Sequence, residues 1–170
     1  MSRIQTGSIS PHPDDLALAD VVEAARTPLV GAERVRTRFD EGLPLVRADA
    51  GLLDRVLANV LENALRHSPG RREVVVQAGR LNDRVQIRVV DRGPGVSEEA
   101  KDQIFAPFQR GGDAPRGDGV GLGLAVARGL TEAMDGTLWA EDTPGGGLTI
   151  VVDLPMVPAV LTPTVAGSAP

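Results

Sequence analysis

The chain has 170 residues, 42% of them hydrophobic and 24% charged, which is enough apolar material for the core of one ordinary domain. Its 18 basic and 23 acidic residues give a net charge of −5, so no overall positive field attracts nucleic acid or an anionic membrane, and we expect neither as a partner. The chain has no Cys and two His, which excludes disulfides and thiolate metal sites and makes a multi-histidine metal site hard to assemble.

The first segment, residues 1–14, has no apolar region typical of a signal peptide, and no run in the chain approaches the ~20 apolar residues of a membrane helix. We therefore expect an amino-terminal extension or linker there and a cytoplasmic location. Apolar residues recur at helical spacing from about Asp15 to Arg26 and predict a helix. Glu33–Phe39 then alternates like a strand, and a short extended piece follows at Leu43–Val46.

Asp49 can cap a long helix that runs to about Ser68, where Pro69-Gly70 ends it. Residues 107–119 hold four Gly and two Pro with no periodicity, which is typical of a functional lid. Residues 156–170 carry no charge and predict a flexible tail. The other predicted elements are strands at 72–78 and 84–90, a short helix at 97–105, a helix at 120–134, and strands at 137–141 and 148–154.

The helix that begins after Asp49 carries two asparagines on its polar face. Asn59 and Asn63 are one turn apart, so their side chains point to the same place, and a cation follows one turn later. Such a face can offer neutral amide oxygens to Mg²⁺ and a positive group to a phosphate. A solvated helix face is the alternative reading of this pattern. The opposite face is ordinary core, formed by Leu53, Val56, Leu57, Val60, Leu61, Ala64 and Leu65.

Glycine clusters mark a second candidate feature. Gly119-Val-Gly121-Leu-Gly123 opens a helix, where glycine lets backbone amides approach a phosphate and the helix dipole favours an anion. The spacing does not fit a dinucleotide-binding fingerprint, because Leu124 and Val126 stand where a third glycine would be required. A P-loop is excluded, since the only lysine, Lys101, follows Ala100.

Asp91 ends a predicted strand and begins the turn Asp91-Arg-Gly93-Pro-Gly95. Its carboxylate can accept a hydrogen bond from an exocyclic amine such as that of adenine, or it can cap the turn. A further cluster, Gly145-Gly-Gly, precedes the last strand.

The order of these pieces resembles the N, G1, F, G2 and final glycine boxes of the histidine-kinase catalytic domain. This is the nucleotide-binding domain that is shared in outline with gyrase-type ATPases, Hsp90 and MutL. The five matching motifs are Asn59-Val-Leu-Glu-Asn63, Asp91-Arg-Gly-Pro-Gly95, Ile104-Phe105-Ala-Pro-Phe108, Gly119-Val-Gly-Leu-Gly123 and Gly145-Gly-Gly-Leu-Thr149. The resemblance covers residues 15–155. It implies a Bergerat-type ATP-binding fold, an α/β (α+β) two-layer sandwich whose mixed β-sheet has helices packed on one face.

The resemblance also implies roles for residues on the asparagine helix. Asn63 would be the Mg²⁺ ligand, with Asn59 beside it facing the metal and the phosphates. Arg66 takes the place of a usual lysine near the terminal phosphates, and His67 that of a residue packed near the nucleotide. Asn59, Asn63 and Arg66 would thus be the catalytic residues, and ATP with Mg²⁺ the cofactors.

For the remaining motifs, the resemblance implies that Asp91 binds the adenine amine while Gly93 and Gly95 shape the pocket floor. A mobile lid over ATP would span about residues 105–119. Leu148 departs from the family pattern, because a small hydroxyl residue is common there, and this puts one water-mediated base contact in doubt. The other nucleotide-contacting residues would be Phe105, Phe108, Arg110, Gly119, Val120, Gly121, Leu122, Gly123, Leu124 and Thr149.

A complete histidine kinase also has a dimerisation helix with a phosphoacceptor histidine, and no such segment is visible here. His12 precedes any predicted helix, and His67 falls in the expected ATP site. The Pro11-His12-Pro13-Asp14-Asp15 string resembles a zinc-deacetylase motif, but that chemistry needs further histidines. We therefore expect a catalytic domain whose partners are the dimerisation and phosphoacceptor domain of the same kinase and, indirectly, a response regulator.

The mechanism we expect is transfer of the ATP γ-phosphate to a histidine on another domain. A gyrase-like ATPase and an anti-sigma-factor serine kinase are alternatives, but both lineages usually carry Glu at the place of Asn59, and a neutral amide argues against water activation. A nucleotide sensor without turnover would present the same ATP contacts and stays open.

Overall fold

The computed structural model describes residues 9–107 and 121–158, and within them five strands form one mixed sheet in the order β2-β4-β5-β7-β6. Strand β2 runs parallel to β4, and the pairs β4–β5, β5–β7 and β7–β6 are antiparallel. In sheet order, the strands span Val35–Phe39, Val74–Leu81, Arg84–Val90, Leu148–Pro155 and Thr137–Asp142.

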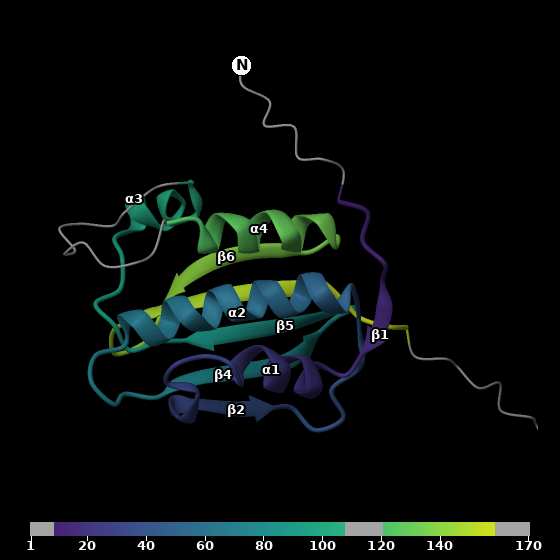
Figure 1. Ribbon diagram of the computed structural model, residues 1–170, viewed down its shortest axis with the longest axis horizontal. Helices are drawn as coiled ribbons and strands as arrows, with labels where there is room; N and C mark the ends of the chain where they lie inside the picture. The colour runs from purple at the N-terminus through teal and green to yellow at the C-terminus, as the bar shows by residue number, and fades with distance from the viewer. Residues whose placement is uncertain (1–8, 108–120, 159–170) are drawn as a thin grey trace, which may run out of the picture.

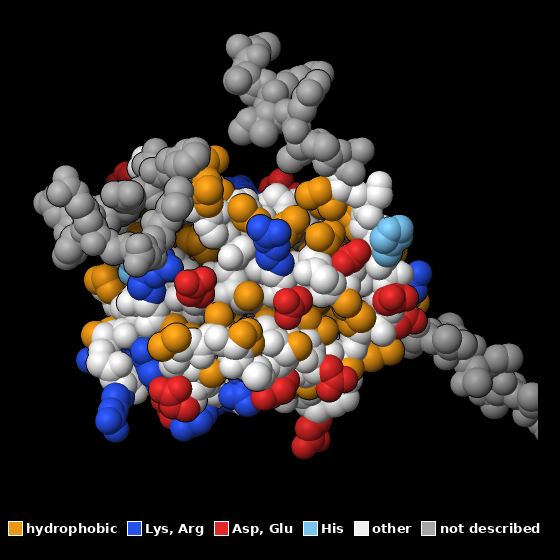
Figure 2. Space-filling view, in the orientation of Figure 1, with side chains coloured by type: hydrophobic (Ala, Val, Ile, Leu, Met, Phe, Trp, Pro, Cys, Tyr) orange, Lys and Arg blue, Asp and Glu red, His pale blue; other side chains and the backbone are white. Residues whose placement is uncertain are grey.

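Three helices pack on one face of this sheet, with α2 (Ala50–His67) between α1 (Leu18–Arg26) and α4 (Gly123–Ala133) (Figure 1). This arrangement confirms the predicted two-layer α/β sandwich with a mixed sheet. Among the described residues, no helix has the length and apolar character needed to cross a bilayer. Acidic, basic and hydrophobic side chains are interspersed over the helix-bearing face (Figure 2).

The core lies between α2 and the central strands. Alternate residues of β4 and β5, among them Val76 and Ile87, are fully buried and face the helices. All seven apolar residues predicted for the buried face of α2 are buried. Asp49 caps this helix as predicted, because its Oδ1 accepts the Leu52 N–H at 3.0 Å. The polar face of α2 is thereby fixed on the side away from the sheet.

The helix predicted from Asp15 begins three residues later, at Leu18. The preceding residues instead form β1 (Asp14–Leu16), which pairs antiparallel with β3 (Val46–Ala48) and joins it through an Asp15–Arg47 ion pair. The extended piece predicted at Leu43–Val46 is likewise displaced to β3. Local periodicity misplaced both segments, because the stabilising strand partner lies about thirty residues away.

Other element boundaries also differ from the sequence prediction. The strand predicted from Glu33 begins at Val35, because residues 32–34 form the 3₁₀ turn η1 (Ala32–Arg34). The helix predicted at 97–105 is split into α3 (Glu98–Lys101) and a 3₁₀ turn, η2 (Gln103–Phe105). Helix α4 begins at Gly123, and residues 108–120 lie outside the described part of the chain.

Both ends of the described chain bond to β3 or to the residues beside it. The His12 N–H donates to Asp49 Oδ2 at 2.8 Å, just before α2. On the other side, Met156 forms a β-bridge with Val46, and the Val157 N–H donates to the Leu45 carbonyl at 2.8 Å. The domain limits expected at residues 15 and 155 stay predictions.

Candidate functional site

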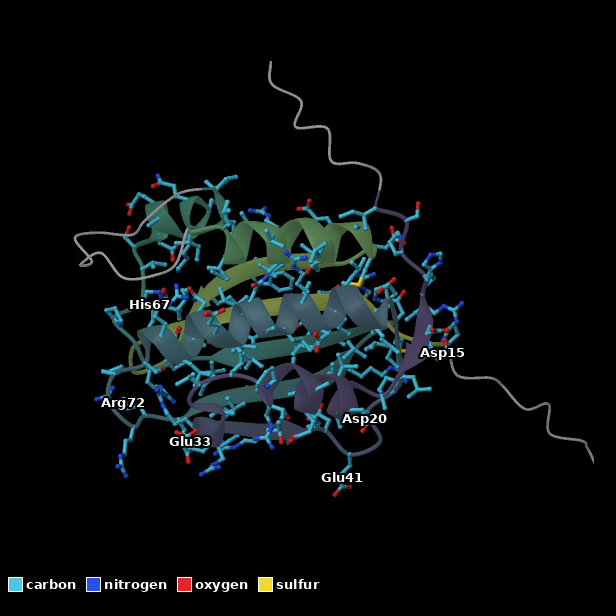
Figure 3. All side chains as sticks on the ribbon, in the orientation of Figure 1. Asp15, Asp20, Glu33, Glu41, His67 and Arg72 are labelled. Carbon is cyan, nitrogen blue, oxygen red and sulfur yellow. The ribbon has the colours of Figure 1, made fainter. Side chains whose placement is uncertain are left out.

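The two asparagines of α2 lie on the same face of the helix, and both side chains are half-buried. Arg66 is half exposed and pairs with Glu62, one turn back, at 3.3 Å. His67 is exposed at the end of the helix (Figure 3). The residues expected at the metal and phosphates therefore occupy one stripe that ends at the carboxyl terminus of α2.

The start of α4 faces this stripe. A Cβ added to Gly123 would lie 3.6 Å from Asn59 Oδ1, so the first turn of α4 contacts α2 at the first asparagine. No side chain among residues 9–107 and 121–158 caps α4, so within this part of the chain its first backbone N–H groups are available to an anion. Gly121 has a φ of 57°, a conformation that favours glycine, whereas Leu124 packs into the core. The structure thus brings together Asn59 and Gly123, which are about sixty residues apart in the sequence.

Asp91 lies at the end of β5 and is 2% exposed. Its Oδ1 accepts two backbone N–H groups, those of Gly93 and Leu148, each at 2.9 Å. For Oδ2, no hydrogen bond is found among residues 9–107 and 121–158. One oxygen of the carboxylate is therefore held rigidly by the backbone while the other can accept a ligand donor.

Glycines around Asp91 are required by close approach. A Cβ on Gly93 would lie 2.6 Å from the His67 carbonyl oxygen, and one on Gly147 would lie 2.1 Å from the Asp91 carbonyl oxygen. Gly95 has a φ of 70°, and a Cβ added to it would lie 3.2 Å from the Gly147 carbonyl oxygen. The turn after β5 is thus wedged between the end of α2 and the glycine run before β7, and side chains are excluded at both contacts.

Thr149 lies in β7, and its predicted contact with the nucleotide stays a prediction. Strand alternation puts its side chain on the face of β7 opposite to Leu148, which belongs to the core below the helices. The Thr149 hydroxyl bonds instead to that of Thr143, at an Oγ1–Oγ1 distance of 2.9 Å, and both threonines are buried. The structure does not bring the Thr149 side chain to Asp91, and the β7 group that reaches the carboxylate is the Leu148 N–H.

The expected lid falls mostly outside the described residues. Phe105, at its start, is 6% exposed in the core, and the Arg128 guanidinium of α4 lies 5.2 Å from its ring centroid. Leu122 is half-buried just before α4. Phe108, Arg110, Gly119 and Val120 lie outside the described residues, so their predicted roles stay predictions.

Sequence reasoning missed two residues that shape the site. Ser68 is 4% exposed, and its Oγ accepts the Arg92 N–H at 3.3 Å, which ties the end of α2 to the Asp91 turn. Gly147 belongs to a run that the sequence analysis noted, but its contact with Asp91 depends on strand pairing. In the sequence, Ser68 before Pro69 indicates only the end of a helix. Nothing in this local pattern indicates that its hydroxyl bonds to Arg92.

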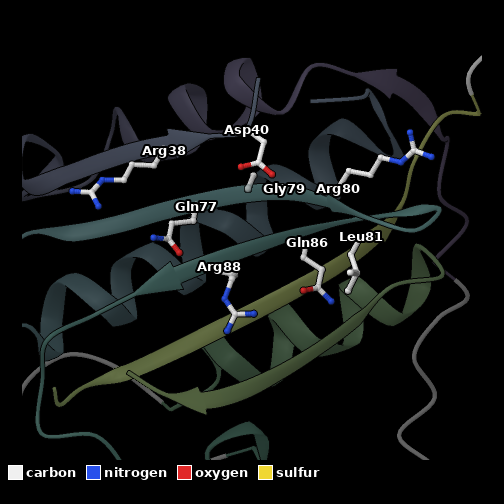
Figure 4. A pocket seen from close by; sticks show the side chains of 9 residues that line it. Arg38, Asp40, Gln77, Gly79, Arg80, Leu81, Gln86 and Arg88 are labelled. Carbon is white, nitrogen blue, oxygen red and sulfur yellow. The ribbon is translucent and has the colours of Figure 1, made fainter. Parts of the chain in front are cut away.

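Two hollows lie away from the site. One, of about 440 Å³, lies over β2, β4 and β5 on the face of the sheet that α2 does not cover (Figure 4). The other, of about 240 Å³, lies between the segment before β1 and the carboxyl end of α4. Neither is lined by the asparagines of α2 or by Asp91. The first is lined by Arg38, Asp40, Gln77, Ala78, Gly79, Arg80, Leu81, Gln86 and Arg88.

Comparison with known proteins gives consistent matches. The family model described as "Histidine kinase-, DNA gyrase B-, and HSP90-like ATPase" matches residues 48–158. The sensor protein KdpD of Mycobacterium tuberculosis (strain ATCC 25618 / H37Rv) is 49% identical over 163 residues, which cover 90% of this chain and 18% of that protein. This chain therefore spans less than a fifth of the length of that relative. The match confirms a likeness to KdpD in particular, which the sequence already suggests at residues 108–112 and 121–130.

Solved structures show the same fold. The crystal structure of full-length ShkA in complex with AMPPNP has a TM-score of 0.75 and 26% sequence identity, covering 90% of this chain and 33% of that one. The mycobacterial sensor histidine kinase MprB has a TM-score of 0.72 and 24% identity, covering 88% of this chain and 99% of that one. The second likeness concerns the fold alone.

Proposed function

Because the chain belongs to the histidine kinase-, DNA gyrase B- and HSP90-like ATPase family, we propose that it binds ATP with Mg²⁺ and donates the γ-phosphate to a histidine. The acceptor is on a separate dimerisation domain of the same sensor kinase, and a response regulator receives the phosphoryl group next. The domain works in the cytoplasm, as part of a kinase held in the membrane. The contact between Asn59 and Gly123 carries the proposal, because it sets the first of the two amides beside a helix start that no side chain of the described residues caps.

The phosphate end of the nucleotide fits the stripe on α2. Asn63, with Asn59 beside it, offers a neutral amide oxygen of the kind that Mg²⁺ accepts together with phosphate oxygens. Because Gly123 has no Cβ, the space next to Asn59 stays open for the metal and the phosphates. When bound, Mg²⁺ supplies neutralisation of phosphate charge. The chain's own part is to hold the phosphates in line with the acceptor.

Arg66 is suited to the terminal phosphates. Its pair with Glu62 is exposed on both sides, with side-chain exposures of 50% and 59%, and such pairs contribute little to stability. The guanidinium can therefore turn toward a phosphate at small cost and donate paired N–H groups to it. The first backbone N–H groups of α4 supply further donors for the same charge.

The base end fits Asp91. Since Oδ1 is occupied by two backbone N–H groups, Oδ2 is the atom left to accept the exocyclic amine of adenine. Guanine presents a carbonyl oxygen at the corresponding place and would meet the carboxylate with no donor. This arrangement supports a preference for ATP over GTP.

The proposal is tested by binding and by transfer. The purified chain should bind ATP in calorimetry, and Asn63→Asp should change the Mg²⁺ concentration that binding requires. Asn82→Asp, in the β4–β5 hairpin, is the matched control and should leave that requirement unchanged. Mixing the chain with the dimerisation domain of the same kinase and γ-labelled ATP should give an acid-labile, base-stable phosphohistidine. Brisk ATP hydrolysis by the chain alone, abolished by Asn59→Ala, would instead support the gyrase-like alternative.

A further inference from the structure

Helix α2 ends without the glycine that commonly closes a helix. Ser68 follows it in an extended conformation, with φ −80° and ψ 114°, and Pro69 comes next. A helix that ends in this way leaves its last carbonyl groups without the bonds that a left-handed cap supplies. Because His67 and the asparagine stripe lie on this last part of α2, whatever satisfies these carbonyls also positions the candidate site.

Arg34, from a distant part of the chain, donates to one of these carbonyls, to that of the residue after the helix and to one further along. Its Nη1 donates to the Leu65 carbonyl at 3.4 Å, its Nη2 to the Ser68 carbonyl at 2.9 Å, and its Nε to the Arg72 carbonyl at 3.1 Å. The guanidinium also places a positive charge at the negative end of the helix dipole. Its neighbours Glu33 and Arg72 lie at the same end of the domain as His67 (Figure 3).

The residues that Arg34 holds also hold the turn that carries Asp91. Ser68 Oγ accepts the Arg92 N–H at 3.3 Å, and Arg72 Nη1 donates to the Arg92 carbonyl at 3.4 Å. Two short paths therefore lead from Arg34 to the residue next to Asp91. On the far side, Arg92 Nη1 donates to the Pro144 carbonyl at 2.6 Å, which fastens the same turn to the loop before β7.

We propose that Arg34 is a positioning residue of the nucleotide site, which sets the end of α2 and, through Ser68 and Arg72, the turn that presents Asp91. The inference rests on the proposed ATP binding for its role in the site, but its first consequence concerns the free chain. A lysine cannot replace Arg34, because three diverging donors in one plane are needed and an ammonium is a compact point charge.

The first test is hydrogen exchange of the free chain. We expect the Gly93 and Leu148 amides, which both bond to Asp91, to exchange about tenfold faster in Arg34→Lys and in Ser68→Ala. The Ile87 amide in β5 should keep its wild-type rate. Arg36→Lys is the matched control, because Arg36 is two residues away and pairs with exposed Glu73 instead of α2.

The second test is ATP affinity measured by calorimetry. Arg34→Lys should bind ATP about tenfold more weakly, as expected for lost charge-assisted hydrogen bonds, and Arg36→Lys should bind it like the wild type. Wild-type exchange at Gly93 and Leu148 in Arg34→Lys would overturn the inference, as would a uniform rise that includes Ile87. Faster local exchange with unchanged ATP affinity would overturn its role in the site. If the wild type binds no ATP but Gly93 and Leu148 still exchange faster in Arg34→Lys, Arg34 positions the Asp91 turn and the proposed function is contradicted.

Discussion

The Leu148 N–H donates to Asp91 Oδ1 at 2.9 Å, and the Asp91 N–H donates to the Leu148 carbonyl at 2.9 Å, so two residues 57 positions apart are bound in both directions. The Gly93 N–H holds the same carboxylate oxygen from the other side. Asp91 Oδ1 is therefore held by the backbone, whereas Oδ2 is left for a ligand. A variant can replace Oδ2 and keep the oxygen that the backbone holds.

Asp91→Asn is such a variant. The amide oxygen can still accept the Leu148 and Gly93 N–H groups, while an NH₂ replaces Oδ2 and would face the adenine amine as a second donor. We expect the variant to fold, to bind ATP at least tenfold more weakly and to discriminate less between ATP and GTP. Calorimetry with both nucleotides measures this, with Asp20→Asn on the exposed face of α1 as the control. Unchanged discrimination between ATP and GTP would refute the role of Asp91 in reading the base.

Gly147→Ala and Gly146→Ala form a matched pair for the contact with Asp91. Both glycines have positive φ values, of 119° and 107°, but only Gly147 has a neighbour at 2.1 Å from an added Cβ, whereas nothing lies within 4 Å of one on Gly146. Gly146→Ala should lower the free energy of unfolding by the backbone strain alone, about 1–3 kcal/mol. Gly147→Ala should cost more, because the Asp91 turn must also move. Urea denaturation of both variants measures the difference, and equal losses of unfolding free energy would contradict it.

Gly123→Ala separates folding from phosphate binding. The added Cβ would lie 3.6 Å from Asn59 Oδ1, an ordinary contact, and alanine favours the helix. We expect unfolding free energy to be unchanged or slightly raised, while ATP affinity falls because the Cβ fills the approach to the first N–H groups of α4. Gly129→Ala, in the same helix with open space around it, should raise stability by about 0.5–1 kcal/mol and leave ATP affinity unchanged. If Gly123→Ala binds ATP as tightly as the wild type, the phosphates do not bind at the first N–H groups of α4.

The fluorescence of Trp139, the only tryptophan in the chain, should follow the protonation of Glu141 on the sheet face that the helices do not cover. Its indole N–H donates to Glu141 Oε1 at 2.8 Å, and this bond, followed by the Arg88 guanidinium, lowers the pKa of Glu141. Because the folded-state pKa is depressed, the stabilisation is present above the unfolded pKa and is lost as the pH falls through the folded one. Tryptophan fluorescence should therefore change with a midpoint below the ordinary Glu value of about 4.3.

Glu141→Gln should remove this fluorescence transition, and Glu73→Gln, which disturbs a different ion pair with Arg36, should leave it in place. A midpoint at or above the ordinary Glu value in the wild type would show that the Trp139 and Arg88 bonds do not hold the carboxylate in solution.

The sequence by itself determined the parts of this protein that depend on local spacing. The buried face of α2, the capping role of Asp49 and the shared direction of Asn59 and Asn63 all follow from the 3.6-residue period, which requires no knowledge of distant residues. The glycine clusters were visible for the same reason, since a backbone that must bend or approach a neighbour closely shows in composition.

Only the tertiary structure decided which distant groups meet. Strand register put the Leu148 N–H against Asp91 and the Thr149 hydroxyl on the other face of the sheet, and a one-residue shift would have reversed the faces of both side chains. Strand pairing with β3 likewise placed Asp15 and Leu16, the start of the predicted helix, in β1. The bonds from Arg34 to the carbonyls of Leu65, Ser68 and Arg72 span 31 to 38 residues. No local pattern encodes a donor whose acceptors are backbone carbonyls, because every residue type carries the same carbonyl.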